Sequence, residues 1–355
     1  MLKQDFISIT KTTQSKLSKT DFENLKFGKE FSDHMFMMDY KDGEWVKPQI
    51  LPFQNLSLNP ATSAIHYGQS IFEGLKAFKG ENGQIGIFRP DKNFARMNKS
   101  AERMCMPQLP EYIFHEALTQ LVSLDRDWIP TAEGSSLYIR PFMFATDEYI
   151  GVKASETYKF IIFTCPVNTY YTAPVKVKLE TNFTRATKGG TGFAKAAGNY
   201  AGALYPARMG NLAGFDQMLW TDAAEHKYIE ESGTMNIFFV IGDTLVTPKL
   251  SETILAGITR DSVLQIAKEW GMKIEEKRVS IEEIITAIEK GTIKEAFGAG
   301  TAATIAPIQI IGYNDIKYTL PEIETREFSK KVIKYLDDIK RFRTEDKYSW
   351  MKIVS

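Results

Sequence analysis

The chain has 355 residues, of which 43% are hydrophobic and 25% charged, and its 44 basic residues balance its 44 acidic ones. This length exceeds one typical core and predicts two domains, while the zero net charge gives no overall field that would attract nucleic acid or an anionic membrane. Cys105 and Cys165 form no CxxC pair. That argues against a disulfide framework or a structural zinc and favours a reducing compartment.

Targeting and metal signals are absent from the sequence. The first residues contain no apolar run of the kind a secretory signal needs, and no stretch approaches the roughly 20 apolar residues of a membrane span. The four histidines are scattered without metal-ligand spacing, so we expect no metal. These observations predict a cytoplasmic protein without nucleic-acid or membrane partners.

The first half of the chain alternates strand and helix patterns. Apolar runs predict strands at MFMMDY (35–40), IGIF (85–88), LYIRPFMFA (137–145) and YKFIIFTC (158–165). Helical spacing of apolar residues predicts a helix that begins at Pro90 and a second at about 112–124. We place a small N-terminal domain at 1–168, followed by a linker at 169–180 that includes the turn-like residues up to Pro174.

The second half is richer in strands and forms the expected large C-terminal domain, 181–355. Strands are predicted at 175–180, 215–221, 227–231, 235–241 and 244–247, and in KEAFGAG before a glycine turn. Helices are predicted from Gly198 toward Met209, at 259–270, after a capping box of Ser280 and Glu283, and around residues 328–339. The pattern predicts an α+β fold of two domains.

The glycine-rich stretch GTGFAKAAGNY, residues 190–200, carries Lys195 at its centre. Its glycines disfavour a regular helix or strand, and the flanking alanines leave room for a ligand to approach. Crowded, uncharged surroundings disfavour the ammonium form of a lysine, and the neutral amine is the form that condenses with aldehydes. The alternative is an ordinary lysine on a mobile surface loop, and this stretch alone does not exclude it.

Two further features lie after the lysine. Glu231 ends a short strand before a Ser-Gly turn, where packing can fix its carboxylate toward a cleft, whereas we expect Glu230 to be solvated. Ile258 and Thr259 lie at the start of a predicted helix, and the N–H groups and dipole there suit a phosphate. Thr259 could equally serve as the helix cap.

A third and a fourth feature suggest anion binding. The turn GAGTAA (298–303) resembles a dinucleotide fingerprint, but Pro307 leaves no room for a crossover helix. The N–H groups of Thr301 and Ala302 fit an anion-binding turn better. Arg96 lies in a predicted helix and Arg140 shares a strand face with aromatic residues, which is typical of anion binding, with a surface salt bridge as the alternative.

One lysine, one acid and two phosphate-type turns are the parts needed to hold pyridoxal phosphate (PLP). The chain also resembles the branched-chain amino acid aminotransferases, which belong to the fold-type IV class of PLP enzymes. The motifs HYGQSIFEGLKAF, LYIRPF, GTGFAKAAGNYA, EESGTMNIFF, LAGITRDSVL and FGAGTAA carry this resemblance in the family's order, over nearly the whole chain. The resemblance implies a two-domain fold with a small α/β domain and a larger strand-rich domain.

The resemblance also implies roles for individual residues. Lys195 matches the lysine that holds the cofactor and moves the substrate Cα proton, and Glu231 the acid that keeps the pyridine nitrogen protonated. The other implied cofactor ligands are Tyr200, Arg185, Arg96, Ile258, Thr259 and Thr301. The implied substrate contacts are Phe31, Tyr67, Phe72, Tyr138, Arg140, Tyr170, Thr234 and Ala302, with Ile150 and Val152 on a loop that reaches the partner's site in a homodimer.

We therefore expect a transaminase that interconverts leucine, isoleucine and valine with their 2-oxo acids, using glutamate and 2-oxoglutarate. The nearest alternative is another fold-type IV enzyme, a D-amino acid transaminase or an aminodeoxychorismate lyase. A different class, a nucleotide-binding oxidoreductase or a binding module without PLP, is the more distant one. The chain departs from mammalian members of the family at Ala303 and Ala306, which replace a CxxC redox pair.

Overall fold

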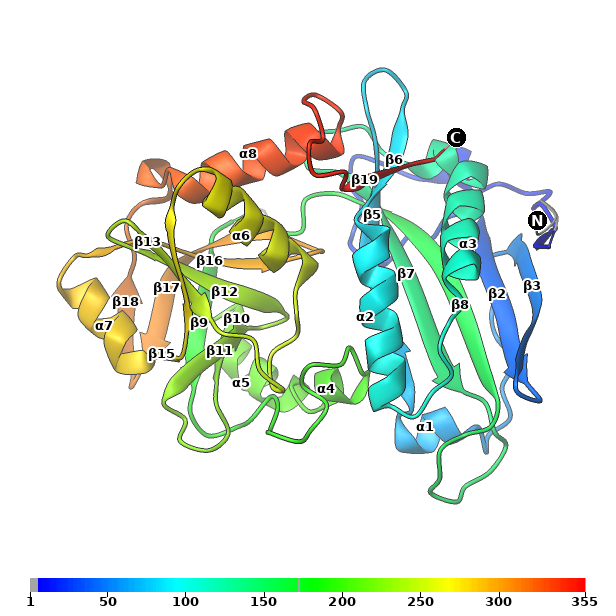
Figure 1. Ribbon diagram of the computed structural model, residues 1–355, viewed down its shortest axis with the longest axis horizontal. Helices are drawn as coiled ribbons and strands as arrows, with labels where there is room; N and C mark the ends of the chain where they lie inside the picture. The colour runs from blue at the N-terminus through cyan, green and yellow to red at the C-terminus, as the bar shows by residue number, and fades with distance from the viewer. Residues whose placement is uncertain (1–5, 172, 355) are drawn as a thin grey trace. The chain divides into compact units, whose positions relative to one another are not determined.

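The computed structural model describes residues 6–171 and 173–354 and divides the chain into two units (Figure 1). The first unit comprises the chain up to Tyr170, the short segment Ala194–Gly198, and the chain from Asp337 onward. The second comprises Tyr171–Phe193 and Asn199–Leu336. No helix among the described residues is long and apolar enough to cross a membrane.

This division differs from the expected one at three places. The expected linker contains a full strand of the second unit, β9 (Val175–Glu180). The segment with Lys195 groups with the first unit because Ala196 forms an antiparallel bridge with Ile71. The C-terminal strand β19 (Met351–Val354) pairs with β6 (Ile85–Phe88) of the first unit. Such pairings are distant in sequence, so local patterns could not predict them.

The first unit is built on one sheet, with strands in the order β1-β3-β2-β8-β7-β5-β6-β19 and with β4 paired to β7. Its remaining strands are β1 (Ser8–Ile9), β2 (His34–Lys41), β3 (Glu44–Pro52), β4 (Ser70–Phe72), β5 (Leu75–Lys79), β7 (Ser136–Ala145) and β8 (Tyr158–Val167). The helices are α1 (Ser63–Tyr67), α2 (Pro90–Arg103) and α3 (Glu111–Leu124), with 3-10 turns at Leu17–Lys19 and Arg126–Trp128.

Local signals explain these elements well. Asp42 and Gly43 have positive φ and close the β2–β3 hairpin, and α2 begins with Pro90 at its first turn. Helices α2 and α3 lie beside the sheet (Figure 1). Their apolar faces pack into one core with it, in which Met97, Phe114 and others are fully buried. The predicted strands and helices of this half are confirmed, whereas α1, β1, β3, β4, β5 and β19 were not predicted.

The second unit holds a longer series of paired strands. They are β9, β10 (Gln217–Thr221), β11 (Tyr228–Ser232), β12 (Met235–Ile241), β13 (Thr244–Pro248), β14 (Lys273–Lys277), β15 (Val279–Ser280), β16 (Ile293–Gly300), β17 (Thr304–Tyr313) and β18 (Ile316–Thr319). In the described residues, pairing of β11 with β12 closes a ring through β16, β17, β9 and β10. The ring encloses a core that includes Ile237, Ala306 and Ile311.

The helices of this half are α4 (Gly198–Ala201), α5 (Leu204–Leu212), α6 (Ile258–Glu269), α7 (Ile281–Glu289) and α8 (Phe328–Lys340), with a 3-10 turn at Ile323–Thr325. Helices α5, α6 and α7 pack on strands of this ring, whereas α4 and α8 each cross the boundary between the two units. The Ser280 side chain accepts the N–H of Glu283 at the start of α7, as the capping-box pattern predicted. Gly271 lies just beyond the end of α6 and has positive φ, the conformation that commonly follows the end of a helix.

Lys76 in β5 provides a pH-dependent element of the first unit. Burial, with a smaller contribution from the charge of Lys340, lowers the pKa of Lys76 from 10.5 to about 7. Between these two pKa values the unfolded chain binds more protons than the folded chain, so stability rises with pH.

We expect the free energy of unfolding of the unmodified chain to rise by about 2 kcal/mol relative to Lys76→Met between pH 7 and pH 9. Urea unfolding curves of both chains at several pH values measure this difference. Parallel pH profiles for the two chains would show that Lys76 is not the titrating group.

Candidate active site

Lys195 lies in the first unit on the edge of β4. The N–H of Phe72 donates to the Lys195 carbonyl at 3.1 Å, and the Lys195 N–H donates to Ser100 Oγ of α2 at 2.9 Å. Ala194 and Ala196 on either side are buried. These contacts hold the lysine segment to a strand and a helix, so it is not the mobile surface loop of the alternative interpretation.

The Lys195 side chain lies against an aromatic ring. Its Nζ is 4.7 Å from the centroid of Phe72, and the guanidinium carbon of Arg140 is 4.6 Å from the same centroid. Cations beside an aromatic ring are attracted by its electron-rich face. Phe72 therefore contacts both the predicted nucleophile and the predicted anion-binding arginine, and the structure brings these three residues together.

A buried glutamate holds Arg96, and sequence reasoning missed it. Arg96 Nε and Nη2 contact the two oxygens of Glu73 at 2.7 and 2.8 Å, and Asn93 donates to the same carboxylate. Burial alone would raise the pKa of Glu73, but the charge and hydrogen bonds of Arg96 outweigh it and lower the pKa below its ordinary value. Glu73 is the single acid within the apolar stretch SIFEGLKAF, and this pattern could have indicated a buried carboxylate.

Tyr138 and Arg140 share one face of β7, as strand alternation predicted. Arg140 Nη2 donates to the Tyr138 hydroxyl at 3.1 Å, and the arginine lies 5.4 Å from the tyrosine ring. The hydroxyl also lies so close to Gly74 that a Cβ there would be 2.1 Å from it. Only glycine fits at Gly74, because any larger residue would displace Tyr138.

The other predicted substrate residues of the first unit fall into two groups. Phe31 stacks on Phe53 within an aromatic cluster, and Phe27 contacts Tyr170. Tyr67 donates through its hydroxyl to the Ile150 carbonyl. Two side chains are strongly exposed, with relative accessibilities of 67% for Ile150 and 86% for Val152. Large apolar side chains in this state are candidates for contact with another molecule.

In the second unit, Glu231 is a buried and fully engaged carboxylate. Its Oε2 contacts Arg185 Nη2 at 2.8 Å, and its Oε1 accepts from Asn236 Nδ2 at 3.1 Å and from the Leu255 N–H at 3.2 Å. Arg185 also donates to the carbonyl of Thr253. This arrangement fixes an ionised acid in one orientation, which is the property required of a partner for a protonated ring nitrogen.

The prediction that Glu230 is solvated is wrong. The residue is 9% exposed, and burial raises the pKa of its carboxyl above the ordinary value. Its Oε1 accepts from the Thr253 hydroxyl, while its Oε2 is buried without a hydrogen-bond partner among the described residues. The residue lies on a strand that pairs on both sides, so its side chain is enclosed where the sequence suggested an exposed strand end.

The two predicted phosphate-type turns both form in the second unit. Helix α6 begins after Gly257 without a side-chain cap, so Thr259 is not the cap. The first turn of such a helix presents N–H groups that lack intrahelical acceptors. Thr301 and Ala302 lie in the turn that joins β16 to β17. Thr234 is exposed beside β12, and Tyr200 lies in α4.

These residues fit the requirements of PLP. An uncapped helix start and the arginine Arg96 suit a phosphate, and a buried, ionised acid such as Glu231 suits a pyridinium nitrogen. Arg185 Nε is buried without a hydrogen-bond partner in the described residues, which is consistent with a polar group approaching it. Lys195 supplies the amine for the aldehyde.

The chain belongs to the amino-transferase class IV family, whose model matches residues 70–311. It is similar to branched-chain-amino-acid aminotransferase 2 of Bacillus subtilis (strain 168), with 47% identity over 347 residues, 97% of this chain and 96% of the relative. It is also similar to a probable branched-chain-amino-acid aminotransferase of Staphylococcus aureus (strain MRSA252), with 46% identity over 341 residues and 95% of each chain.

Solved structures of similar proteins share the fold. A branched-chain amino acid aminotransferase from Escherichia coli is 25% identical, with a TM-score of 0.73, and the match covers 90% of this chain and 99% of that one. The branched-chain amino acid aminotransferase from Thermobaculum terrenum, solved in its PLP-form, is 22% identical with a TM-score of 0.72, over 90% of this chain and 98% of that one. The α+β fold expected from the sequence is thereby confirmed.

Cysteine chemistry gives one testable expectation for this family member. The resemblance to the family implies that Ala303 and Ala306 replace a mammalian redox pair. Burial also raises the pKa of the Cys165 thiol to about 11, which disfavours its reactive thiolate. We expect mild peroxide to leave transamination within about twofold of the untreated rate. Rapid inactivation that a dithiol reverses, and that replacing Cys105 abolishes, would contradict this expectation.

Proposed function

We propose that this protein is a PLP-dependent transaminase of leucine, isoleucine and valine, with glutamate and 2-oxoglutarate as the second substrate pair. The observation that carries the proposal is the match at 47% identity over nearly the full chain to a branched-chain-amino-acid aminotransferase. The motifs around Lys195 and Glu231 lie inside the matched range, and the contacts of both side chains suit PLP. When bound, PLP supplies a ring that accepts the electron pair left on the substrate Cα.

Lys195 is proposed to be the residue that would hold the cofactor aldehyde through Nζ, and the same amine would move the proton of the substrate Cα. The side chain lies against Phe72, which limits its freedom and its contact with water. A base held beside the proton that it abstracts accelerates transfer without a bimolecular encounter. Both half-reactions need the same proton movement, so one lysine serves both.

Glu231 is proposed to keep the pyridine nitrogen protonated, and Arg185 to keep Glu231 ionised and oriented. The 2.8 Å contact between these two side chains supports this division of roles. Tyr200 is proposed to contact the phenolic oxygen of the cofactor. The proposed phosphate ligands are Arg96, the N–H groups of Ile258 and Thr259, and Thr301.

The substrate α-carboxylate is proposed to meet the Tyr138 hydroxyl and the N–H groups of Thr301 and Ala302. The Tyr138 hydroxyl is already aligned by Arg140 at 3.1 Å, which supports a fixed donor at this position. The side-chain pocket is proposed to include Phe31, Tyr67, Phe72, Tyr170 and Thr234. Aromatic walls suit a branched aliphatic side chain because they exclude water from it.

The experiment that tests the proposal combines a spectrum, a covalent trap and a donor panel. The purified protein should show a visible band that borohydride abolishes, with the reduced cofactor recovered on the peptide containing Lys195. Initial rates with leucine, isoleucine, valine, glutamate and D-alanine then separate the branched-chain activity from that of a D-amino acid transaminase. A protein without the band, or one that prefers D-alanine, would overturn the proposal.

Arg140 is proposed to accept the γ-carboxylate of glutamate in the pocket that also takes leucine. A cation in an apolar pocket needs other partners when leucine is bound, and the Phe72 ring and the Tyr138 hydroxyl supply them. We expect Arg140→Met to slow the glutamate half-reaction about 10- to 100-fold more than the leucine half-reaction, because a charge-assisted contact is lost. Single-turnover absorbance changes with each donor measure this, and equal losses would make Arg140 structural.

The protein is further proposed to act as a cytoplasmic homodimer. Ile150 and Val152 are strongly exposed, which supports contact with a second copy of the chain. Cys105 and Cys165 are both free thiols, which is typical of a reducing compartment. Light scattering of the purified protein tests the dimer directly, with a double Ile150→Ser, Val152→Ser variant as the comparison.

A further inference from the structure

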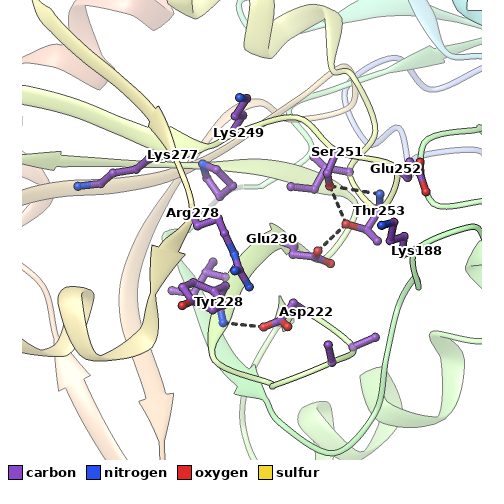
Figure 2. A pocket seen from close by; sticks show the side chains of 15 residues that line it. Lys188, Asp222, Tyr228, Glu230, Lys249, Ser251, Glu252, Thr253, Lys277 and Arg278 are labelled. Carbon is purple, nitrogen blue, oxygen red and sulfur yellow. Dashed lines mark hydrogen bonds between the residues drawn. The ribbon is translucent and has the colours of Figure 1, made fainter.

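A cavity of about 520 Å³ lies wholly within the second unit, beside β11 (Figure 2). Its walls come from β11, the loop at 222–228, the segment 248–254, Lys188 and the end of β14. Figure 2 shows Glu230 in the middle of the lining residues, with Arg278 and Tyr228 on one side and Ser251 and Thr253 on the other. Cavities of this volume are in the range that holds small organic ligands.

The floor of the cavity presents a carboxyl group with unused hydrogen-bonding capacity. Glu230 is 9% exposed, and its Oε2 is buried without a partner among the described residues. Burial raises the pKa of this carboxyl, which favours its protonated form. Thr253 donates to the other oxygen, so in its protonated form Glu230 can donate an O–H to a ligand in the cavity. A buried polar group without a partner is unfavourable, and a hydrogen-bond acceptor would relieve that cost.

The rim of the cavity is positively charged. Arg278 lies 3.5 Å from the centroid of the Tyr228 ring and is paired with Glu225 at 3.2 Å on the exposed side of the rim, and Lys188 and Lys249 also line the space. The remaining two acids of the lining have other partners: Asp222 accepts from backbone N–H groups of its own loop, and Glu252 accepts from the Gly189 N–H. The rim therefore favours an anionic group on the ligand.

Apolar side chains complete the lining. Ile229, Pro248 and Ile254 contribute to the walls, and two of them, Ile229 and Ile254, are almost fully buried. We propose that this cavity is a second small-molecule site, which binds an organic monocarboxylate that carries a carbonyl oxygen and a compact apolar body. The carboxylate binds Arg278, the carbonyl oxygen accepts from Glu230, and the apolar body packs on the isoleucines and the proline.

The same residues connect this cavity to Glu231. The Thr253 hydroxyl donates to Glu230, and the Thr253 carbonyl accepts from Arg185, which contacts Glu231. A ligand that draws Glu230 toward itself displaces Thr253 and alters the support of Arg185. Occupancy is therefore expected to change kcat without competing with the amino acid substrate. This second consequence rests on the proposed function, whereas binding itself does not.

The probe is 4-oxo-4-phenylbutanoate, with 4-phenylbutanoate as the matched compound that lacks the carbonyl. Saturation-transfer NMR is recorded on the holoenzyme after aminooxyacetate has blocked the cofactor aldehyde. We expect the first compound to bind with a dissociation constant of about 1 mM or below, given its size. The second should bind roughly three- to tenfold more weakly, because one hydrogen bond is lost.

Variants locate the binding. Arg278→Met should weaken both compounds about 10- to 100-fold, and Lys294→Ala, a charge-matched exposed control in the same unit, should not. Glu230→Leu should abolish the preference for the carbonyl compound, whereas Glu230→Gln, which keeps a donor, should retain it. If Glu230→Leu does not fold, the exposed Arg278 variant still decides the matter. Absence of binding, or binding that is indifferent to Arg278→Met, would overturn the site.

The kinetic consequence is tested on the unblocked enzyme. With the probe at saturation we expect kcat to fall at least about twofold while the KM for leucine stays constant. An unchanged kcat would overturn the connection to Glu231, and a rise in KM alone would show competition at the substrate site. An enzyme that is inactive before the probe is added would instead contradict the proposed function, so the two failures are distinguishable.

Discussion

Replacing Lys195 by alanine is expected to lower transamination at least about a thousandfold with every amino donor. Alanine can neither bind the cofactor aldehyde nor move the substrate Cα proton, and a positioned base alone contributes about 10²- to 10⁴-fold. The fold should survive, because the hydrogen bonds of Lys195 to Phe72 and Ser100 are made by its backbone groups, and only the side-chain contact with the Phe72 ring is lost. Steady-state rates with leucine and glutamate measure the loss.

A matched lysine separates this effect from a general loss of charge. Lys176 in β9 is exposed, and Lys176→Ala should keep the rates of the unmodified enzyme. The Lys195 variant should still bind PLP through its other contacts, but borohydride should no longer attach the cofactor to the protein. Retention of covalent cofactor on a different lysine would show that Lys195 is the wrong nucleophile.

Local sequence signals predicted much of the candidate site. Tyr138 and Arg140 were placed together by the two-residue period of a strand, and their 3.1 Å hydrogen bond confirms it. The small neighbours of Lys195 indicated a crowded setting, and Ala194 and Ala196 are indeed buried. These features depend only on residues a few positions apart, so patterns of periodicity and size capture them.

Contacts between segments that are distant in the sequence could not be predicted from such local patterns. Glu73 is 23 residues from Arg96. A lone acid in an apolar stretch indicates a buried carboxylate, but nothing local identifies Arg96 as its partner. Ala196 bridges Ile71, which places the lysine segment with the first unit and not with the large domain expected from chain order. Glu230 was expected to be a solvated acid at a strand end, yet it is buried and accepts a hydrogen bond from Thr253, which is 23 residues away. Burial of a charged side chain depends on tertiary neighbours, which a single sequence does not specify.

Glu231→Gln is expected to keep PLP bound but to lower kcat by about a hundredfold or more, with a much smaller change in KM. The amide has nearly the same shape, but it carries no charge to hold a ring nitrogen protonated, and loss of a preorganised electrostatic contact has effects of this size. Glu276→Gln is the matched control, because Glu276 is also paired with an arginine, at 2.7 Å from Arg260, and its side chain is 46% exposed.

The size of the Glu231 effect should depend on Arg185. In the unmodified chain the arginine compensates the buried carboxylate, so Glu231→Gln leaves a buried cation beside a neutral amide. Arg185→Met in the Glu231→Gln background removes that cation and should restore part of the lost stability, measured by thermal unfolding, but none of the lost kcat. The double variant should therefore regain thermal stability without regaining kcat, because only the charge on Glu231 acts on the ring nitrogen. Recovery of kcat in the double variant would show that the rate depends on the ion pair's structure and not on the carboxylate's charge.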